Sequence, residues 1–434
     1  MMTTSVSITV FTTAPRHVRV GKRTRRYIFR RWNRLGAEVE TEIDRGASLS
    51  YPSPENSYKS RSRSRLPIVF LLPRRATKLF ASTSTSSAAE ESQPRFDADE
   101  QEEPKMSSQA ASRDVSHQTD ISRMQSEGDG TFKRKPSVFR NWIEKGGKFE
   151  PERDRYHLYV SYACPWACRT LITRKLKGLE EIIPFTAVSP RMGEHGWPFA
   201  NVDPFPAAGV DSINHAEHIK DLYLKADPSY SGRFTVPVLW DKKHQTIVNN
   251  ESSEIIRIFN AAFNDLIEDE QKRKLDIYPE GLRKEIDELN EWVYDGINNG
   301  VYKSGFASTQ AAYEKAVTQV FESLDRIEKL FEAKKNKEFL IGDQLTEADV
   351  RLFVTIVRFD PVYVGHFKCN FRTIRNGYPN IHYWLRKLYW TNPAFSSTTN
   401  FDHIKTHYYW SHPHINPTRI VPVGSIPNIE PLHE

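Results

Sequence analysis

The sequence is poor in cysteine: its 434 residues include only three, at positions 164, 168 and 369. Three thiols cannot build a disulfide scaffold, which excludes the class of small disulfide-rich secreted proteins and favours a reducing compartment. Long apolar runs are also missing. The stretch at residues 66–72 is too short to cross a bilayer, which takes about 20 apolar residues, and no later stretch approaches that length. We therefore expect no membrane span.

Acidic residues are scarce at the start of the chain. Residues 1–80 hold 17 Lys and Arg against five Asp and Glu, so this part carries +12 and the remainder −6. The basic charge therefore gives no reason to expect nucleic-acid binding by the body of the protein. Arg/Ser-rich stretches such as residues 60–65, followed by an acidic segment at 90–105, are typical of an organellar transit peptide and a linker. We predict a transit peptide and disordered linker over residues 1–105, with an ordinary disordered tail as the alternative.

The body divides into two patterns. Residues 156–263 predict the order strand, helix, strand, helix, strand, strand, helix, which is that of a thioredoxin-like domain. From Gln271 onward strand patterns nearly vanish, and apolar residues recur at helical spacing. The fold class predicted is an α/β thioredoxin-like domain over residues 130–265 followed by an all-α domain over residues 272–425. The expected helices of the second domain are Leu282–Asn298, Gln310–Ala333, Thr346–Phe359 and Ile381–Leu388.

The two neighbouring cysteines lie where the first strand runs into the first helix. A thiol at a helix N-terminus is stabilised as the thiolate by free N–H groups, so we expect Cys164 to be a nucleophile with a lowered pKa. The alternative is a buried structural cysteine. Cys168 follows one turn later, at a spacing of four instead of the three of dithiol oxidoreductases. We expect a monothiol enzyme that closes its cycle with an external thiol, with a resolving role for Cys168 as the alternative.

Two further features follow in the order that this fold requires. A proline inside a strand, as in Val236-Pro237, predicts either an edge strand or a cis bond. A cis bond turns the Val236 backbone toward the thiol, where it can pair with a peptide-like ligand. Glu251 and Ser252 begin the helix after the last strand, where free amides attract a carboxylate. Helix capping alone also explains the serines at 252 and 253.

Taken together, these motifs resemble a glutathione transferase with a catalytic cysteine. Three further segments narrow the resemblance to the glutathionyl-hydroquinone reductases, the xi class. They are the loop from Ser189 through Trp197 to Phe199, the run from Gly300 through Tyr302 to Ala307, and the segment from His403 through Tyr408 to Tyr409. The resemblance covers residues 130 to 425. The leader lies outside it and suggests a plastid-targeted plant member, located in the chloroplast.

The resemblance implies the following roles. Cys164 would be the nucleophile, and Tyr302 and Tyr408 would approach the quinol. Tyr409 is the alternative to Tyr408 in this role. Glutathione would be the co-substrate and glutathionylated quinols the other partner. Separately from the resemblance, the apolar faces of the many expected helices favour a homodimer. The glutathione-binding residues would be Trp197, Arg233, Val236, Glu251 and Ser252.

The expected reaction reduces a glutathionyl-hydroquinone through a mixed disulfide on Cys164 and releases oxidised glutathione. A general glutaredoxin-like thioltransferase or a dehydroascorbate reductase on the same fold is the alternative. A non-catalytic scaffold is a third interpretation, which slow alkylation of Cys164 at pH 6 would favour. No metal is expected, since the cysteines lack a histidine pair at ligand spacing and His412 and His414 stand in a surface-like tail.

Overall fold

The computed structural model describes residues 29–32, 38–41 and 128–432. In the leader, β1 (Phe29–Trp32) pairs antiparallel with β2 (Glu38–Thr41). This hairpin belongs to a separate unit, residues 1–105, and the rest of the transit-peptide prediction lies outside the described residues. Neither the transit peptide nor its plastid destination is tested by the structure, so both stay predictions.

A four-stranded mixed sheet forms the first half of the body, in the order β4-β3-β5-β6. The edge strand β4 pairs parallel with β3, while β5 runs antiparallel to both β3 and β6. The strands are β3 (Tyr156–Val160), β4 (Phe185–Ala187), β5 (Val238–Asp241) and β6 (Thr246–Asn249). The helices are α1 (Pro165–Leu176), α2 (Ile219–Ala226) and α3 (Ser252–Ala261). The predicted element order and fold class are confirmed.

Strand limits differ from the prediction at one informative place. The apolar run 234–240 predicts a strand interrupted by Pro237, and only the part after the proline pairs in the sheet, as the start of β5. The peptide bond between Val236 and Pro237 is cis, as predicted, and proline has no N–H to give to a ladder. The residues before Val238 therefore leave the sheet and are free to face the helix that follows β3.

Every described element after residue 261 is helical. The predicted helices at 282–298, 310–333, 346–359 and 381–388 are all present, two of them ending in π-helical segments. The elements are η2 (Asn264–Leu266), α4 (Glu270–Lys274), η3 (Glu280–Leu282), α5 (Arg283–Val293), η4 (Tyr294–Asn298), α6 (Gly300–Gly305), α7 (Gln310–Glu332), α8 (Glu347–Arg358), η5 (Phe359–Tyr363), α9 (Ile374–Gly377), α10 (Pro379–Thr391), α11 (Pro393–Ser396) and α12 (Phe401–Ser411). No described helix is long and apolar enough to cross a membrane.

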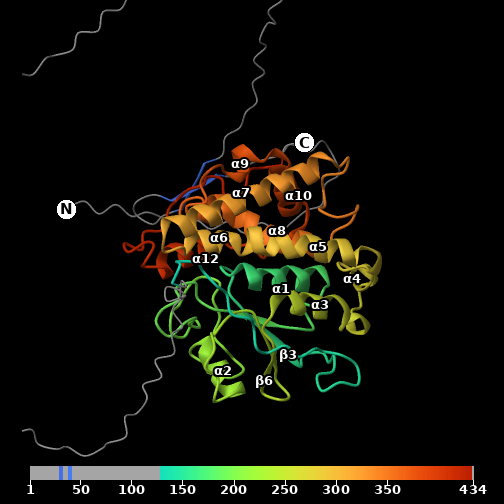
Figure 1. Cartoon of the computed structure of the whole chain (residues 1–434). Helices are drawn as coiled ribbons and strands as arrows, with labels where there is room; N and C mark the ends of the chain where they lie inside the picture. The colour runs from blue at the N-terminus through green and yellow to red at the C-terminus, as the bar shows by residue number, and fades with distance from the viewer. Residues whose placement is uncertain (1–28, 33–37, 42–127, 433–434) are drawn as a thin grey trace, which may run out of the picture. The chain divides into compact units, whose positions relative to one another are not determined.

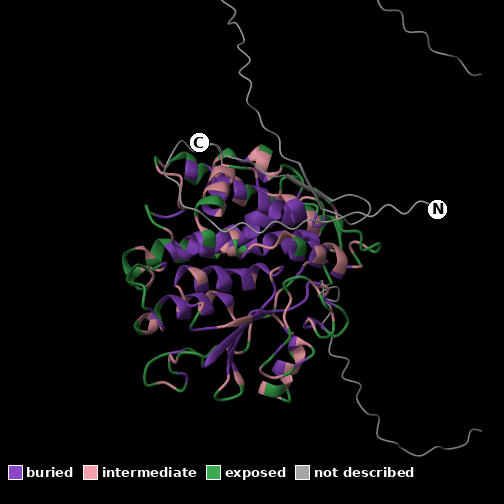
Figure 2. Cartoon of the chain, turned by 180° about the vertical axis from the view of Figure 1, so that it is seen from behind, coloured by how far each residue is buried: buried purple, intermediate pink, exposed green. Residues whose placement is uncertain are grey.

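Helix α1 lies between the sheet and the helical half (Figure 1), and it packs against α3 on one side and α8 on the other. One side of this segment belongs to the core over the sheet and carries Cys164, Ala167 and Leu171. The side that carries Cys168 and Ile172 belongs to the core of the helical half. A band of buried residues accordingly runs through the middle of the body (Figure 2).

The first turn of α8 is fixed by a buried carboxylate. Asp349 accepts hydrogen bonds from the backbone N–H groups of Thr346 (3.0 Å) and Leu340 (2.9 Å) and from the indole N–H of Trp384 (3.0 Å). The first of these belongs to a capping box, which satisfies N–H groups that a helix start leaves free. Asp349 therefore ties α8 to α10 and to the loop before α8.

We predict that Asp349→Ala lowers the free energy of unfolding by about 3 kcal/mol, because the substitution leaves buried donors without an acceptor. The measurement is urea unfolding followed by circular dichroism. Asp343→Ala is the matched control, because Asp343 is an exposed residue of the same loop and its loss should change little. Equal stability of the two variants would contradict the role of this cap.

Candidate active site

Cys164 occupies the N-cap position of α1, with Pro165 in the first turn. Its side chain is 9% exposed, and its Sγ lies 3.4 Å from the carbonyl oxygen of Val236, to which the thiol donates. The strand β3 ends at Val160, so the short connection to α1 brings the thiol to the carboxyl end of the sheet. The structure thus brings together the predicted nucleophile and the residue before the cis proline.

The thiol does not have the lowered pKa that the sequence suggested. Burial raises the pKa of Cys164 to about 11, and the backbone N–H groups of Ala167 and Trp166 act in the opposite direction without overcoming it. The expectation was wrong because it considered only the effect of the helix N-terminus, which lowers the pKa of a thiol. It left out desolvation of the sulfur, which raises that pKa. Slow alkylation at pH 6 is therefore expected of the enzyme itself and no longer points to a scaffold.

Cys168 faces away from the first thiol, into the helical half. Its Sγ lies 3.2 Å from the carbonyl oxygen of Tyr162 and 2.9 Å from a guanidinium nitrogen of Arg358. All three cysteines are free and buried. The geometry is consistent with one working thiol, and the absence of a redox role for Cys168 stays a prediction.

Glu251 and Ser252 lie at the start of α3, as predicted, but their local roles differ from the expectation. Glu251, not a serine, caps the helix: its carboxylate accepts from the backbone N–H of Ser253 (3.1 Å). Burial opposes its ionisation, but the bonds from Ser253 and the charge of Arg169 hold the pKa of the Glu251 carboxyl below its usual value. The buried Ser252 hydroxyl accepts a bond from Arg169 at 3.4 Å.

Arg233 is half-buried directly before Phe234, with no ion-pair partner among the described residues. Burial, and then the nearby charge of Arg134, lower its pKa to about 10. A guanidinium in this setting is suited to a carboxylate ligand, because the ligand would supply the missing counter-charge. The predicted role of Arg233 is compatible with this environment.

The long loop after β4 is held against α12. Trp197 is buried, and its indole stacks on the imidazole of His407 with ring centroids 4.5 Å apart. The imidazole in turn lies 3.0 Å from the carbonyl oxygen of Pro190 in the same loop. Trp197 therefore lies next to the helix that carries Tyr408.

Tyr302 and Tyr408 meet although they are far apart in sequence. Their hydroxyl groups are hydrogen-bonded, and the hydroxyl of Tyr363 lies 3.0 Å from that of Tyr408. Burial, followed by interaction with Cys164, raises the pKa of Tyr302 to about 12. Tyr409 instead bonds to the carbonyl oxygen of Pro361, so the structure places Tyr408 in the tyrosine cluster and Tyr409 outside it.

One prediction about the C-terminal segment is wrong. His412 is 1% exposed and not part of a surface tail, and its imidazole lies 2.9 Å from that of His366. His414 is exposed, as expected. Among the described residues, no group of three or more His, Cys, Asp or Glu side chains is placed to hold a metal ion.

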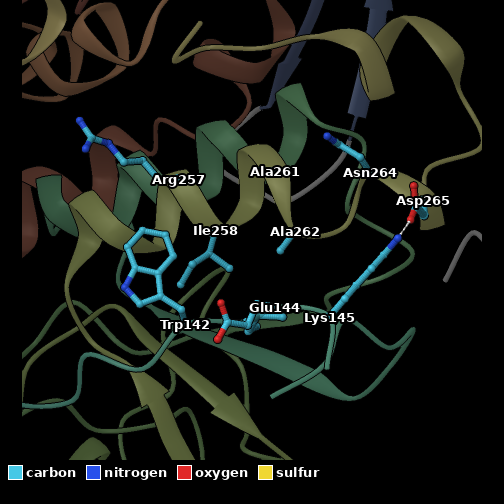
Figure 3. Close-up of a pocket in the computed structure, with 10 residues that line it drawn as sticks. Trp142, Glu144, Lys145, Arg257, Ile258, Ala261, Ala262, Asn264 and Asp265 are labelled. Atoms are coloured by element: carbon cyan, nitrogen blue, oxygen red, sulfur yellow. Dashed lines mark hydrogen bonds and ion pairs between the residues drawn. The ribbon is translucent and has the colours of Figure 1, made fainter. Parts of the chain in front are cut away.

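A separate surface pocket lies on the outer side of α3, bordered by Trp142 and by the ion pair between Lys145 and Asp265 (Figure 3). Its lining also includes Glu144 and Arg257, and Arg257 is already paired with Glu347 and Asp287. None of the predicted site residues lines it. The chemistry therefore belongs to the buried thiol site and not to this pocket.

Comparison with known proteins agrees with this geometry. The model "Glutathione S-transferase, N-terminal domain" matches residues 163–262, and "Glutathione S-transferase, C-terminal domain" matches residues 310–387. "Glutathione S-transferase omega-like 2" of Schizosaccharomyces pombe is 59% identical over 70% of this chain and 96% of its own length. "Glutathionyl-hydroquinone reductase YqjG" of Escherichia coli is 52% identical over 70% of this chain and 92% of its own.

Solved structures give the class. The glutathione-S-transferase Xi of Phanerochaete chrysosporium is 71% identical, with a TM-score of 0.71, over 73% of this chain and all of its own. This chain belongs to the xi class of glutathione transferases. The glutathione-bound structure of the E. coli protein YqjG is also similar, with a TM-score of 0.64, 52% identity and coverage of 70% of this chain and 96% of its own.

Sequence reasoning missed three residues that the structure places around the predicted site. Arg134, from the segment before the first family match, lies over the rings of Trp166 (4.9 Å) and Tyr302 (5.2 Å). Arg169, fully buried on α1, donates to Ser252 and lies 4.5 Å from the Trp166 ring. Tyr363 joins the tyrosine cluster. Only the position of Arg169, one turn after Pro165 on the same helix, offered a signal in the sequence.

We predict that alkylation of Cys164 by iodoacetamide accelerates about tenfold per pH unit between pH 6 and pH 9. A thiol whose pKa is raised to about 11 ionises only slightly in this range, and its thiolate fraction grows in proportion to hydroxide. Peptide mass spectrometry gives the rate at each site, and Cys164→Ser gives the background from the other two cysteines. A rate that levels off below pH 8 would contradict the raised pKa.

Proposed function

We propose that this enzyme is a glutathione-dependent oxidoreductase that reduces glutathionyl-hydroquinones to hydroquinones. The observation that carries the proposal is the position of Cys164 between Val236, which can bind a peptide backbone, and the tyrosine cluster. Relatives at about half identity that are named glutathionyl-hydroquinone reductases support it, as do glutathione-bound structures of similar transferases.

Glutathione is the co-substrate, and its recognition follows from the sheet side of the site. The carbonyl of Val236 and its N–H can pair with the cysteinyl unit of glutathione as an added strand. The start of α3, with Glu251 and Ser252, suits the γ-glutamyl end, because free amides favour a carboxylate there. Arg233 provides a cation for a carboxylate, and Trp197 would close the site from the long loop.

The first step transfers the glutathionyl group. The Cys164 thiolate attacks the sulfur of the glutathionyl-hydroquinone, forming the S–S bond of a mixed disulfide while the bond between sulfur and the aromatic carbon breaks. The ring carbon takes both electrons of that bond and a proton from Tyr302, acting as general acid. The thiol proton of Cys164 replaces the one lost by the tyrosine, so the step consumes no external proton.

The second step regenerates the thiol. A glutathione thiolate attacks the glutathionyl sulfur of the mixed disulfide, and the thiolate of Cys164 leaves and is reprotonated. Overall, one glutathionyl-hydroquinone and one glutathione give one hydroquinone and one oxidised glutathione. The aromatic carbon is reduced and the two sulfurs are oxidised. Because the first product leaves before the second thiol reacts, the kinetics should be ping-pong.

A general thioltransferase or dehydroascorbate reductase could use the same thiol and the same glutathione site. The tyrosine cluster favours the aromatic substrate, since a buried wall of phenol rings with a proton donor has no use in exchanging small disulfides. Hydroxyethyl disulfide and a glutathionyl-hydroquinone, compared as substrates of the same preparation, separate the two functions. The homodimer and the chloroplast location remain proposals beside this function.

We predict that Cys164→Ser abolishes turnover of a glutathionyl-hydroquinone, because the weakly acidic serine hydroxyl cannot replace a thiolate as nucleophile or form a disulfide. Product formation is followed by chromatography, and intact-protein mass spectrometry should detect a glutathione adduct on the parent but not on the variant. Cys369→Ser is the matched control, because the Cys369 thiol is also buried but contacts the carbonyl oxygen of Phe367 and not Cys164 or Val236, so the variant should retain turnover. Full activity of Cys164→Ser would falsify the scheme.

We predict that Tyr302→Phe slows quinol release about a hundredfold, the contribution of a typical general acid. Exchange between the mixed disulfide and glutathione should be unchanged, because that step involves no protonation of carbon. Stopped-flow single-turnover measurements separate the two steps. Tyr409→Phe removes a hydroxyl outside the cluster and serves as the control; equal slowing in both variants would remove Tyr302 from the mechanism.

A further inference from the structure

Arg358, the last residue of α8, holds the backbone that leads into the reactive thiol. Its side chain is 1% exposed. The guanidinium Nη2 donates to the carbonyl oxygen of Tyr162 at 2.8 Å, and Nε donates to that of Ala163 at 3.1 Å. These are the two residues directly before Cys164. A residue of the helical half therefore fixes the position at which α1 begins.

The charge of this guanidinium has no carboxylate partner among the described residues. Its remaining contacts are the carbonyl oxygen of Val354 (2.6 Å) and the thiol of Cys168 (2.9 Å), both neutral groups. Some buried or half-buried arginines of the body are paired, as Arg155 is with Asp241 and Arg257 with Glu347. Within the described part of the chain, Arg358 instead shares its lack of an ion pair with the buried Arg169 and Arg174. A buried unpaired charge is costly, so its retention needs a physical reason.

The groups around Arg358 supply that reason, because nearly all of them become anionic on losing a proton. Burial opposes the charge of Arg358, but the surrounding thiol and phenol groups outweigh it and raise its pKa, so the cation persists. Its charge in turn works to lower the pKa of Cys164 and of the clustered tyrosines. Burial lowers the pKa of His407, and the charge of Arg358 acts in the same direction. The titratable groups in question are Cys164 at the start of α1, Cys168 on α1, Tyr302 on α6, Tyr363 on η5, and His407 and Tyr408 on α12.

We propose that Arg358 is a positioning residue of the reaction, which fixes the carbonyls before Cys164 and provides the permanent positive charge against which Cys164 ionises. The inference deepens the proposed function, on which its catalytic meaning rests. During the first step, negative charge moves from the sulfur to a tyrosine oxygen. The same guanidinium remains beside both groups, and no counter-ion has to enter the buried site.

The test replaces Arg358 in the full chain with two neutral residues of different shape. Arg358→Gln keeps a donor for the carbonyls without the charge, and Arg358→Met keeps the apolar bulk. An opposite charge at close range lowers a pKa by about one unit or more, so either variant should leave about tenfold less thiolate. The more basic thiolate is also a better nucleophile, which offsets part of the loss. Alkylation of Cys164 at pH 8 should therefore fall about threefold, with the whole pH profile displaced upward.

Two controls separate charge from structure. Arg358→Lys retains the charge and should keep the parent profile more closely than either neutral variant. Arg174→Met removes a buried arginine of α1, which donates to the carbonyl oxygens of Ile183 and Glu180 beyond the C-terminal end of that helix, and should leave the profile unchanged. Thermal unfolding of each variant checks that it is folded.

A folded neutral variant whose alkylation profile coincides with that of the parent overturns the proposal. An identical displacement in Arg358→Lys and Arg358→Gln also overturns it, because a change of shape alone would then account for the effect. The readout needs no quinol. Failure of the parent to turn over a glutathionyl-hydroquinone would count against the proposed function while leaving this test of Arg358 intact.

Discussion

The arrangement of the body depends on one helix that is buried on both sides. Ten of the twelve residues of α1 are buried, and its two faces belong to different cores. A helix with an apolar stripe on one side can shift or tilt against a single neighbour, but α1 is confined by α3 and α8 together. Its N-terminus is thereby fixed at the end of the sheet, and the nucleophile is placed with it.

The same constraint gives the two cysteines of α1 different surroundings. Cys164 faces the core over the sheet and donates to Val236. Cys168, one turn later, faces the core of the helical half and contacts Arg358. Two thiols on one helix are thus separated by the boundary between the cores, which agrees with a cycle in which glutathione provides the second sulfur.

Positive charge is concentrated around the thiol. Residues 128–434 hold 40 Lys and Arg and 40 Asp and Glu, so this part of the chain is neutral overall. The surroundings of the thiol nevertheless collect arginines from four separate segments: Arg134, Arg169, Arg233 and Arg358. Cations gathered in a low-dielectric site act more strongly on an anionic ligand than the same charges would at the surface. Burial is also the reason why the pKa of Cys164 is raised, a cost that no motif in the sequence records.

Local sequence determined the element order, the fold class and the position of the thiol at a helix start, because each depends on neighbours within a few residues. At Pro237 it left an edge strand and a cis bond as alternatives, and the structure has the cis bond. Tertiary structure alone decided that Tyr408 and not Tyr409 meets Tyr302, that His412 is buried, and that Arg358 reaches the backbone before Cys164. These contacts join residues tens to about two hundred positions apart. Their geometry and their desolvation arise only when the two cores close around α1, so the chain reveals the reacting group but not the environment that sets its acidity.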